Sequence, residues 1–211
     1  MSHVVLLGDC IFDNRRYTGG GPDVISQVRR ALPPGWQATL LAIDGSVADD
    51  VPRQVGRLPP DATHLVLSVG GNDALLQASV LDEAVSSAAQ AFGLLADVRN
   101  DFEPRYRAAV AACLRPAVPL ALCTIYNGRF PDPAYQRLAT VAVTIFNDVI
   151  LGVAIEHALP VIDLRAICVD YHDYANSIEP SSQGGEKIAR AIAALLTEGN
   201  TPVRAARIVS G

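Results

Sequence analysis

Five short, continuously apolar runs alternate with longer segments of helical spacing along this chain. Runs of this length without polar alternation are typical of strands that are covered on both faces of a parallel sheet. Strands that alternate with helices predict an α/β fold with right-handed crossover connections. The five expected strands are 3–7, 38–43, 64–69, 120–125 and 160–164.

The segments between these runs carry the signals of helices. The first expected helix has a proline near its start and ends at Pro33-Pro34, which suits the fixed φ and the missing N–H of proline. The segment 83–114 is long and rich in alanine, and we expect two helices in it, broken near Asn100-Asp101. The other expected helices are 22–32, 47–58, 135–157 and 184–196.

Length and charge limit the class of protein. The chain has 211 residues, half of them hydrophobic, so we expect a single domain over 1–200 and a loosely attached tail over 201–211. The net charge is −5 and no run of Lys and Arg occurs, so we expect no nucleic-acid partner. No run reaches the about 18 to 20 unbroken apolar residues of a membrane helix, and no signal-peptide pattern begins the chain. We therefore expect no membrane partner and a cytoplasmic location.

The cysteine pattern favours free thiols. None of the four cysteines belongs to a C-x-x-C pair, so we expect no zinc, no other metal and no cofactor. Three of them lie in apolar surroundings and are interpreted as small buried hydrophobic residues. Cys10 differs, because it follows Gly8-Asp9 where the first apolar run ends. It is either one more buried residue or a nucleophile at the mouth of the sheet.

Polar residues and glycines follow every expected strand. In open parallel sheets, sites form beyond the carboxyl ends of the strands. We therefore expect the segments after the strands to meet at one edge of the sheet. These segments are Gly8-Asp9-Cys10, Asp44-Gly45-Ser46, Gly70-Gly71-Asn72-Asp73, Tyr126-Asn127-Gly128-Arg129 and a loop over 165–183 that carries His172, Asn176 and Glu179.

The chain resembles the SGNH hydrolases of the GDSL esterase/lipase family in four blocks that occur in the family's order. "GDCIFDN" is similar to the first block, "IDGSVADD" to the second, "SVGGND" to the third, and "NSIEPSSQGGEKIA" to the last. The resemblance implies a three-layer α/β/α fold, flavodoxin-like, with a five-stranded parallel sheet. It also implies chemistry on a small acyl ester or thioester through a covalent intermediate, with an oxyanion hole formed by Cys10, Gly45 and Asn72.

The chain departs from the family pattern at three positions. Cys10 stands where the family has its nucleophilic serine, and Asn176 and Glu179 stand where it has aspartate and histidine. The usual division of labour among serine, histidine and aspartate therefore cannot operate.

A thiol nucleophile needs less help than a hydroxyl, because its pKa is about 8.5 and nearby backbone N–H groups lower it further. Glu179 is then a candidate base, since burial raises a carboxyl pKa toward neutrality. The same carboxylate opposes thiolate formation by like-charge repulsion. His172 is an alternative base, with Glu179 or Asp173 orienting its ring, unless it is a solvated loop histidine.

Further residues are candidates for binding. Asp13 and Asn14 follow the first block, and Tyr126, Asn127 and Arg129 follow the fourth expected strand. We expect them to line the site, with Arg129 available for a substrate carboxylate. Asn72 and Asp73 are also good N-cap types for a helix from Ala74, a role compatible with an oxyanion donor.

Three hypotheses follow for the function. The first is an esterase, thioesterase or acyltransferase with a thiol nucleophile, in which transfer or cyclisation competes well with hydrolysis because the histidine base is missing. The second is a ligand-binding protein whose active site has been lost. In the third, Cys10 is a replacement of serine introduced to trap a complex.

Overall fold

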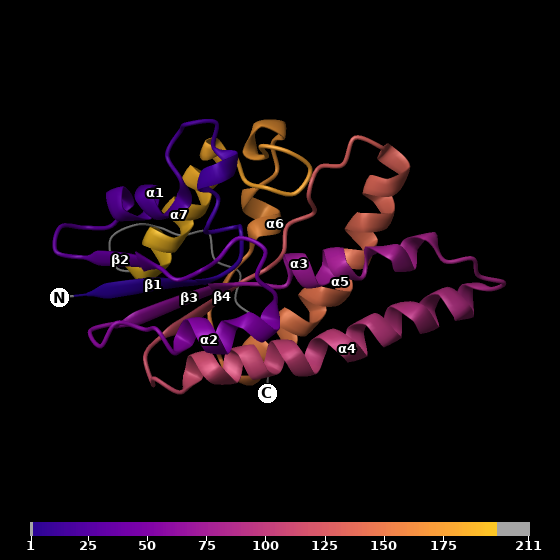
Figure 1. Cartoon of the computed structure of the whole chain (residues 1–211), viewed down its shortest axis with the longest axis horizontal. Coiled ribbons are helices and arrows are strands. Elements are labelled where there is room, and N and C mark those ends of the chain that lie inside the picture. Colours follow the sequence, from indigo (N-terminus) through magenta and orange to yellow (C-terminus); the bar gives the residue numbers. More distant parts are fainter. Residues whose placement is uncertain (1, 198–211) are drawn as a thin grey trace.

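A computed structural model describes residues 2–197 of the chain, so the expected tail over 201–211 lies outside the described residues. The strands form one sheet in the order β2-β1-β3-β4-β5, and every neighbouring pair is parallel (Figure 1). The expected α/β class with a five-stranded parallel sheet is confirmed. The strands are β1 (His3–Gly8), β2 (Gln37–Leu40), β3 (His64–Ser68), β4 (Leu120–Cys123) and β5 (Val161–Ile162).

Helices cover both faces of the sheet, which explains the continuous apolar runs. Val4 and Leu6 of β1 belong to the core on one face, and Val5 and Leu7 belong to the core on the other. Side chains alternate along a strand, so both sets are buried only in a three-layer arrangement. The first face packs against α1 (Val24–Ala31), α6 (Leu164–Ile167) and α7 (Ser182–Leu196), and the second against α2 (Val51–Val55), α4 (Ala88–Leu114) and α5 (Pro133–Glu156).

The expected break near Asn100 and Asp101 is wrong, because α4 is one helix from Ala88 to Leu114. Asp101 forms an ion pair with Arg105 one turn later, and Arg99 pairs with Glu103 in the same way. Such i,i+4 pairs support a helix across residues of low intrinsic propensity. The second half of α4 also buries Phe102, Tyr106, Ala109 and Val110 against the sheet.

Short elements carry the chain across the carboxyl edge of the sheet. Gly8, at the end of β1, has φ of 122°, and a Cβ there would lie 1.7 Å from the carbonyl oxygen of Ser68. Only glycine permits this close approach of β1 to β3. The short elements are α3 (Gly71–Leu76) and the 3₁₀ helices η1 (Arg15–Tyr17), η2 (Ala48–Asp50), η3 (Ala78–Asp82) and η4 (Tyr171–Asp173).

Helix α5 is unusually apolar. By length and composition it is able to cross a membrane, with a mean hydropathy of 2.1 over a window of which only 39% is buried. Core helices of soluble proteins pass the same test, so the expectation of no membrane partner stays a prediction.

Candidate active site

Cys10 sits in a tight turn directly after β1. The Asp9 carbonyl accepts hydrogen bonds from the N–H groups of Phe12 and Asp13, and the Asp9 carboxylate accepts one from the Ile11 N–H at 3.1 Å. Asp9 thus braces the turn. The Cys10 side chain is 7% exposed and lines a cavity.

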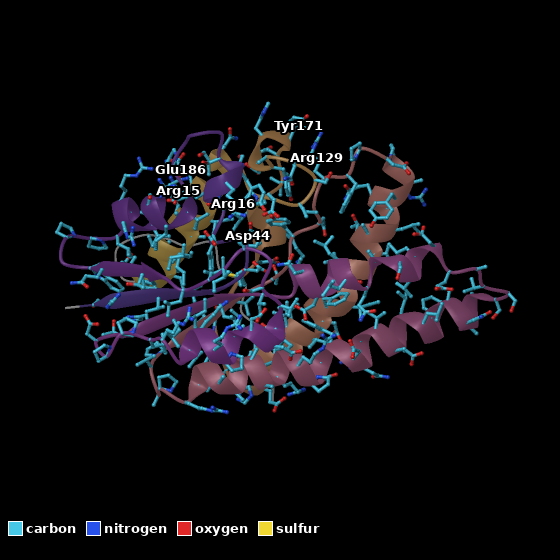
Figure 2. The ribbon with its side chains drawn as sticks, in the orientation of Figure 1. Arg15, Arg16, Asp44, Arg129, Tyr171 and Glu186 are labelled. Atoms are coloured by element: carbon cyan, nitrogen blue, oxygen red, sulfur yellow. The ribbon has the colours of Figure 1, made fainter. Side chains whose placement is uncertain are left out.

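Three side chains from distant parts of the sequence meet at this turn. The sulfur of Cys10 and one carboxylate oxygen each from Asp44 and Glu179 all lie within 4.8 Å of one another. Asp44 follows β2, and its carboxylate accepts a hydrogen bond from the Tyr17 hydroxyl at 2.9 Å and lies 3.9 Å from Arg16 (Figure 2). The sheet therefore brings together the predicted nucleophile and the predicted carboxylate base.

Glu179 is a buried carboxylate with an unused oxygen. It is 5% exposed, and its Oε2 has no hydrogen-bond partner among residues 2–197. Burial raises its pKa above the ordinary value, while the Cys10 thiol lowers it in part. A buried oxygen left without a partner is costly in a purely structural role, which favours a role in proton transfer or ligand binding.

The Cys10 thiol is held in its protonated form. Burial raises its pKa far above the ordinary value, and the carboxylates of Asp9, Glu179 and Asp44 raise it further. The expectation that backbone N–H groups favour the thiolate is therefore wrong for this site. Desolvation and like-charge repulsion raise the pKa of the thiol more than the backbone N–H groups of the turn lower it, because no long helix begins at this turn.

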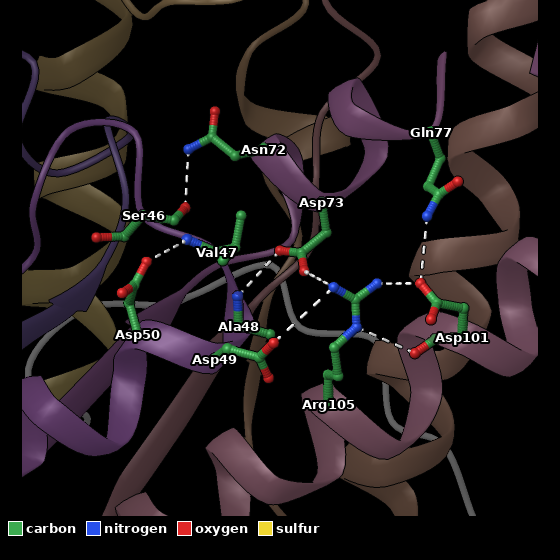
Figure 3. Close-up of polar contacts among 10 residues, drawn as sticks. All are labelled: Ser46, Val47, Ala48, Asp49, Asp50, Asn72, Asp73, Gln77, Asp101 and Arg105. Carbon is green, nitrogen blue, oxygen red and sulfur yellow. Dashed lines mark hydrogen bonds and ion pairs between the residues drawn. The ribbon is translucent and has the colours of Figure 1, made fainter. Parts of the chain in front are cut away.

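Of the three predicted oxyanion donors, Cys10 and Asn72 line the cavity and Gly45 does not. Among residues 2–197, the N–H groups of Cys10 and Gly45 have no hydrogen-bond acceptor. Asn72 lies in the first turn of α3 and donates from Nδ2 to the Ser46 carbonyl oxygen at 2.8 Å (Figure 3). A primary amide has two N–H bonds, so one of them stays available to a ligand.

A polar network holds α3 against the loop after β2. Asp73 is 1% exposed, and its Oδ2 accepts a hydrogen bond from the Ala48 N–H at 3.0 Å. Arg105 of α4 approaches the other Asp73 oxygen at 3.9 Å and also pairs with Asp49 and Asp101 (Figure 3). The expected N-cap role of Asn72 and Asp73 is wrong, because α3 begins earlier, after Gly70, and neither side chain caps it.

A cavity of about 110 Å³ opens beside Cys10. Cys10 and Asn72 line one part of it, and Tyr126 and Asn127 line it from the segment after β4. The Tyr126 hydroxyl donates to the Ile178 carbonyl at 2.5 Å, next to Glu179 in the chain. Tyr126 and Asn127 therefore lie at the cavity, where the sequence places them.

The structure places two other predicted residues outside the cluster. The His172 side chain is exposed and lies edge-on to Tyr171. The Arg129 guanidinium is exposed and covers the Tyr171 ring, 3.9 Å from its centre (Figure 2). None of His172, Arg129 and Glu179 lines the cavity beside Cys10. Glu179 is the better placed of the two candidate bases, because a carboxylate oxygen of Glu179 lies within 4.8 Å of the Cys10 sulfur.

The expectation that Asp13 and Asn14 line the site is wrong, because neither they nor Asn176 lines the cavity, and all three instead contact the backbone around it. Asp13 accepts from the Asp44 N–H at 3.0 Å, and buried Asn14 donates to the Pro180 carbonyl and accepts from the Val24 N–H. Asn176 is exposed, and its Oδ1 accepts from the N–H groups of Ile178 and Glu179, both at 2.9 Å. Asn176 therefore fixes the backbone of Glu179 and does not touch the cavity.

Asp44, Tyr17 and Arg105 were not among the predicted site residues, although Asp44 lies in a segment expected at this edge of the sheet. The position of Asp44 directly after an apolar run was a usable signal. Arg105 carries no such signal, because it is one of several arginines at ordinary helix spacing.

A thiol and two carboxylates are donor types that a divalent cation such as zinc accepts. Cys10, Asp44 and Glu179 offer one such atom each. The expectation that the site takes no metal therefore stays a prediction.

The chain matches the family model of the GDSL-like lipase/acylhydrolase family over residues 6–187. No curated protein sequence matches it. Among solved structures, an extracellular lipase from Streptomyces rimosus is 15% identical with a TM-score of 0.64, covering 95% of this chain and 100% of that one. A phospholipase A1 from Streptomyces albidoflavus is 17% identical (TM-score 0.63; 92% and 98% covered). The carbohydrate acetylesterase Est24 from Sinorhizobium meliloti is 12% identical (TM-score 0.65; 93% and 98% covered). At these identities the structural likeness concerns the fold.

Proposed function

The chain belongs to the GDSL-like lipase/acylhydrolase family, and we propose that it processes acyl esters or thioesters through a thioester formed on Cys10. One observation carries the proposal: the Cys10 sulfur lines a cavity and lies within 4.8 Å of a buried Glu179 carboxylate that has an unpartnered oxygen among residues 2–197. A nucleophile beside a base is the arrangement that covalent catalysis needs.

In the proposed acylation step, the Cys10 sulfur attacks the acyl carbon while Glu179 accepts the thiol proton. The raised pKa of the Cys10 thiol favours proton transfer during the attack over a preformed thiolate. The oxyanion accepts hydrogen bonds from Cys10, Gly45 and Asn72. When it collapses, the bond from carbon to the leaving oxygen or sulfur breaks, and Glu179 returns the proton to the leaving group.

In the second step, water or another nucleophile attacks the thioester carbon and gives its proton to Glu179. The carbon–sulfur bond then breaks, and the proton returns to the sulfur of Cys10. A carboxylate is a weaker base than imidazole, so amines, alcohols or an internal nucleophile of the substrate compete better with water than in a histidine-based esterase.

Kinetics of two cysteine variants test this proposal. We expect Cys10→Ala to reduce hydrolysis of p-nitrophenyl acetate to the uncatalysed rate. Cys168→Ala is the matched control, because Cys168 is also a free, buried cysteine but does not line the cavity. Full activity in Cys10→Ala would refute the proposal.

A ligand-binding protein without catalysis is the second candidate. The observation that favours it is the charge of the site, where three carboxylates raise the pKa of the thiol. A binder retains its ligand unchanged, so saturable binding of esters with no product and no protein adduct would favour this candidate over the enzyme.

We also propose a cytoplasmic location and a small-molecule acyl substrate. The four free cysteines favour a reducing compartment. Fractionation of the native host, with detection by antibody, tests the location.

A further inference from the structure

We propose that the cavity beside Cys10 holds a medium-length acyl group of about four to eight carbon atoms, so that the substrates are medium-chain acyl esters or thioesters. This inference rests on the proposed function and names its substrate class.

The lining of the cavity is mostly apolar beyond the reacting groups. Cys10 and Asn72 share it with side chains from α3, η3, α4 and α5, so it leads from the sulfur into the layer of helices. An acyl group bonded to the sulfur has its carbonyl near Asn72 and its hydrocarbon directed along this lining. The apolar residues contributed by these elements are Leu75, Val80, Leu81, Leu95, Val98, Ala139, Ala142, Val143, Ile145 and Phe146.

The size of the cavity sets the length of its occupant. Its volume is about 110 Å³, and an apolar protein cavity of about 150 Å³ accepts a benzene molecule. An acetyl group would leave most of the space empty, and a palmitoyl chain would extend well beyond it. A group near six carbon atoms matches the space.

The helices that line the cavity also carry exposed apolar side chains, which do not line it. Leu76, Phe92, Leu138 and Val141 are 71%, 71%, 51% and 62% exposed, and they belong to the same helices that line the cavity. Figure 1 shows α3 and the first halves of α4 and α5 extending beyond the sheet. An apolar helix is normally covered, and a hydrocarbon chain entering between these helices covers the apolar inner side of α5.

Ala142 and Val141 provide a matched pair of variants. Ala142 is half-buried and lines the cavity, whereas Val141 is exposed and does not. The substitution Ala142→Phe places a ring inside the cavity, and Val141→Phe places the same ring outside it. Both positions are distant in sequence from the reacting residues.

The experiment measures kcat/KM for p-nitrophenyl acetate, butyrate, hexanoate, octanoate and palmitate. In the unmodified protein, kcat/KM should rise about fourfold for each added methylene up to hexanoate, as burial of hydrocarbon predicts, and fall for palmitate. Ala142→Phe should lower the ratio of the hexanoate value to the acetate value at least tenfold, and Val141→Phe should leave this ratio unchanged. Equal values for acetate and hexanoate in the unmodified protein would overturn the inference, as would equal losses for both esters in Ala142→Phe.

A binding measurement separates failure of this inference from failure of the proposed function. Acetate turnover through Cys10 without any preference for chain length rejects the inference alone. If no ester is turned over, calorimetric titration with the unreactive ketone 2-octanone still tests the cavity. Binding that Ala142→Phe abolishes supports the inference, and absence of binding rejects it.

Medium-chain acyl groups occur on thioester carriers and on glycerolipids. The final arm compares the hexanoyl thioester of N-acetylcysteamine with monomeric dihexanoyl phosphatidylcholine. Faster turnover of the first assigns the acyl group to a thioester, and faster turnover of the second assigns it to a lipid. Turnover of both below the rate of the acetyl thioester contradicts the inference.

Discussion

At the scale of single residues, the site combines a protonated thiol with a buried carboxylate. The carboxylates around Cys10 raise its pKa, and burial raises the pKa of Glu179. A thiolate formed before the reaction is therefore unfavourable at this site. The raised pKa of Glu179 makes it a better match for proton transfer near neutral pH than a carboxylate of ordinary pKa. This difference from a cysteine–histidine pair leads to distinct expectations for pH dependence.

The first prediction concerns the base. Glu179→Gln should lower the rate of acylation by about 10² to 10⁴, the usual contribution of a general base. In the unmodified protein the rate should fall as the pH drops through the raised pKa of Glu179, because only the carboxylate accepts a proton. Stopped-flow acylation across pH measures both effects, with Glu186→Gln on the exposed side of α7 as control. An unchanged acidic limb in Glu179→Gln would exclude Glu179 as the base.

The second prediction concerns Asp9, whose pKa burial raises to about 8 from an ordinary value of 3.8. Between these values the folded protein binds a proton that the unfolded chain has lost, so stability should fall as the pH rises from about 4 to about 8. A pKa shift of two units corresponds to a change of about 3 kcal/mol in the free energy of unfolding. Asp9→Asn should remove this pH dependence in urea unfolding, whereas exposed Asp82→Asn should not. Parallel pH profiles of Asp9→Asn and the unmodified protein would contradict the assignment.

The sequence indicates the position of a residue most clearly where a motif coincides with the end of a strand. Cys10 and Asn72 are adjacent to apolar runs, and both line the cavity. Glu179 was predicted only by its position in the last block. The choice between Glu179 and His172 depended on how a long loop folds, which is fixed by contacts such as Asn14 to Pro180 that no local pattern reports.

At the scale of elements, the site depends on how α3 and the loop after β2 are tied to α4. Asn72 contacts Ser46, Asp73 contacts Ala48, and Arg105 approaches Asp73 from α4. These contacts fix the position of Asn72 relative to the loop after β2. Such supporting contacts keep a reacting geometry in place.

The third prediction tests this support. Arg105→Met leaves buried Asp73 without its cation, which should lower the free energy of unfolding by about 1 to 3 kcal/mol and lower kcat more than it changes KM. Arg107→Met on the same helix removes only surface ion pairs with Glu103 and Glu156. It should therefore lower the free energy of unfolding by less than about 1 kcal/mol. Urea unfolding and steady-state kinetics measure both variants. Equal effects of the two substitutions would show that Arg105 is an ordinary surface residue.

Elements were predicted well where hydrophobic pattern alone determines them. All five strands occur within a few residues of their expected positions, because a doubly covered strand needs a continuous apolar run. Helix α4 was expected to break at Asn100 and Asp101, and it continues because ion pairs and tertiary packing outweigh weak propensity. Helix α6 has only 4 residues, so its hydrophobic pattern is too short to predict a helix.

At the scale of the whole molecule, the parallel sheet is what brings the reacting groups together. Cys10 follows β1, Asp44 follows β2, and Asn72 follows β3, while Glu179 reaches the same edge from the loop before α7. Glu179 is more than a hundred positions from the other three residues in the sequence, and the strand order β2-β1-β3 places the segments that carry Asp44, Cys10 and Asn72 side by side. The central claim is that this edge presents Cys10 as an acyl acceptor.

Intact-protein mass spectrometry after a brief reaction with p-nitrophenyl acetate and an acid quench tests that claim most directly. We predict a single acetyl adduct that peptide mapping assigns to Cys10, that neutral hydroxylamine removes as expected of a thioester, and that is absent from Cys10→Ala. An unmodified mass at every reaction time, or an adduct of equal yield in Cys10→Ala, would contradict the account.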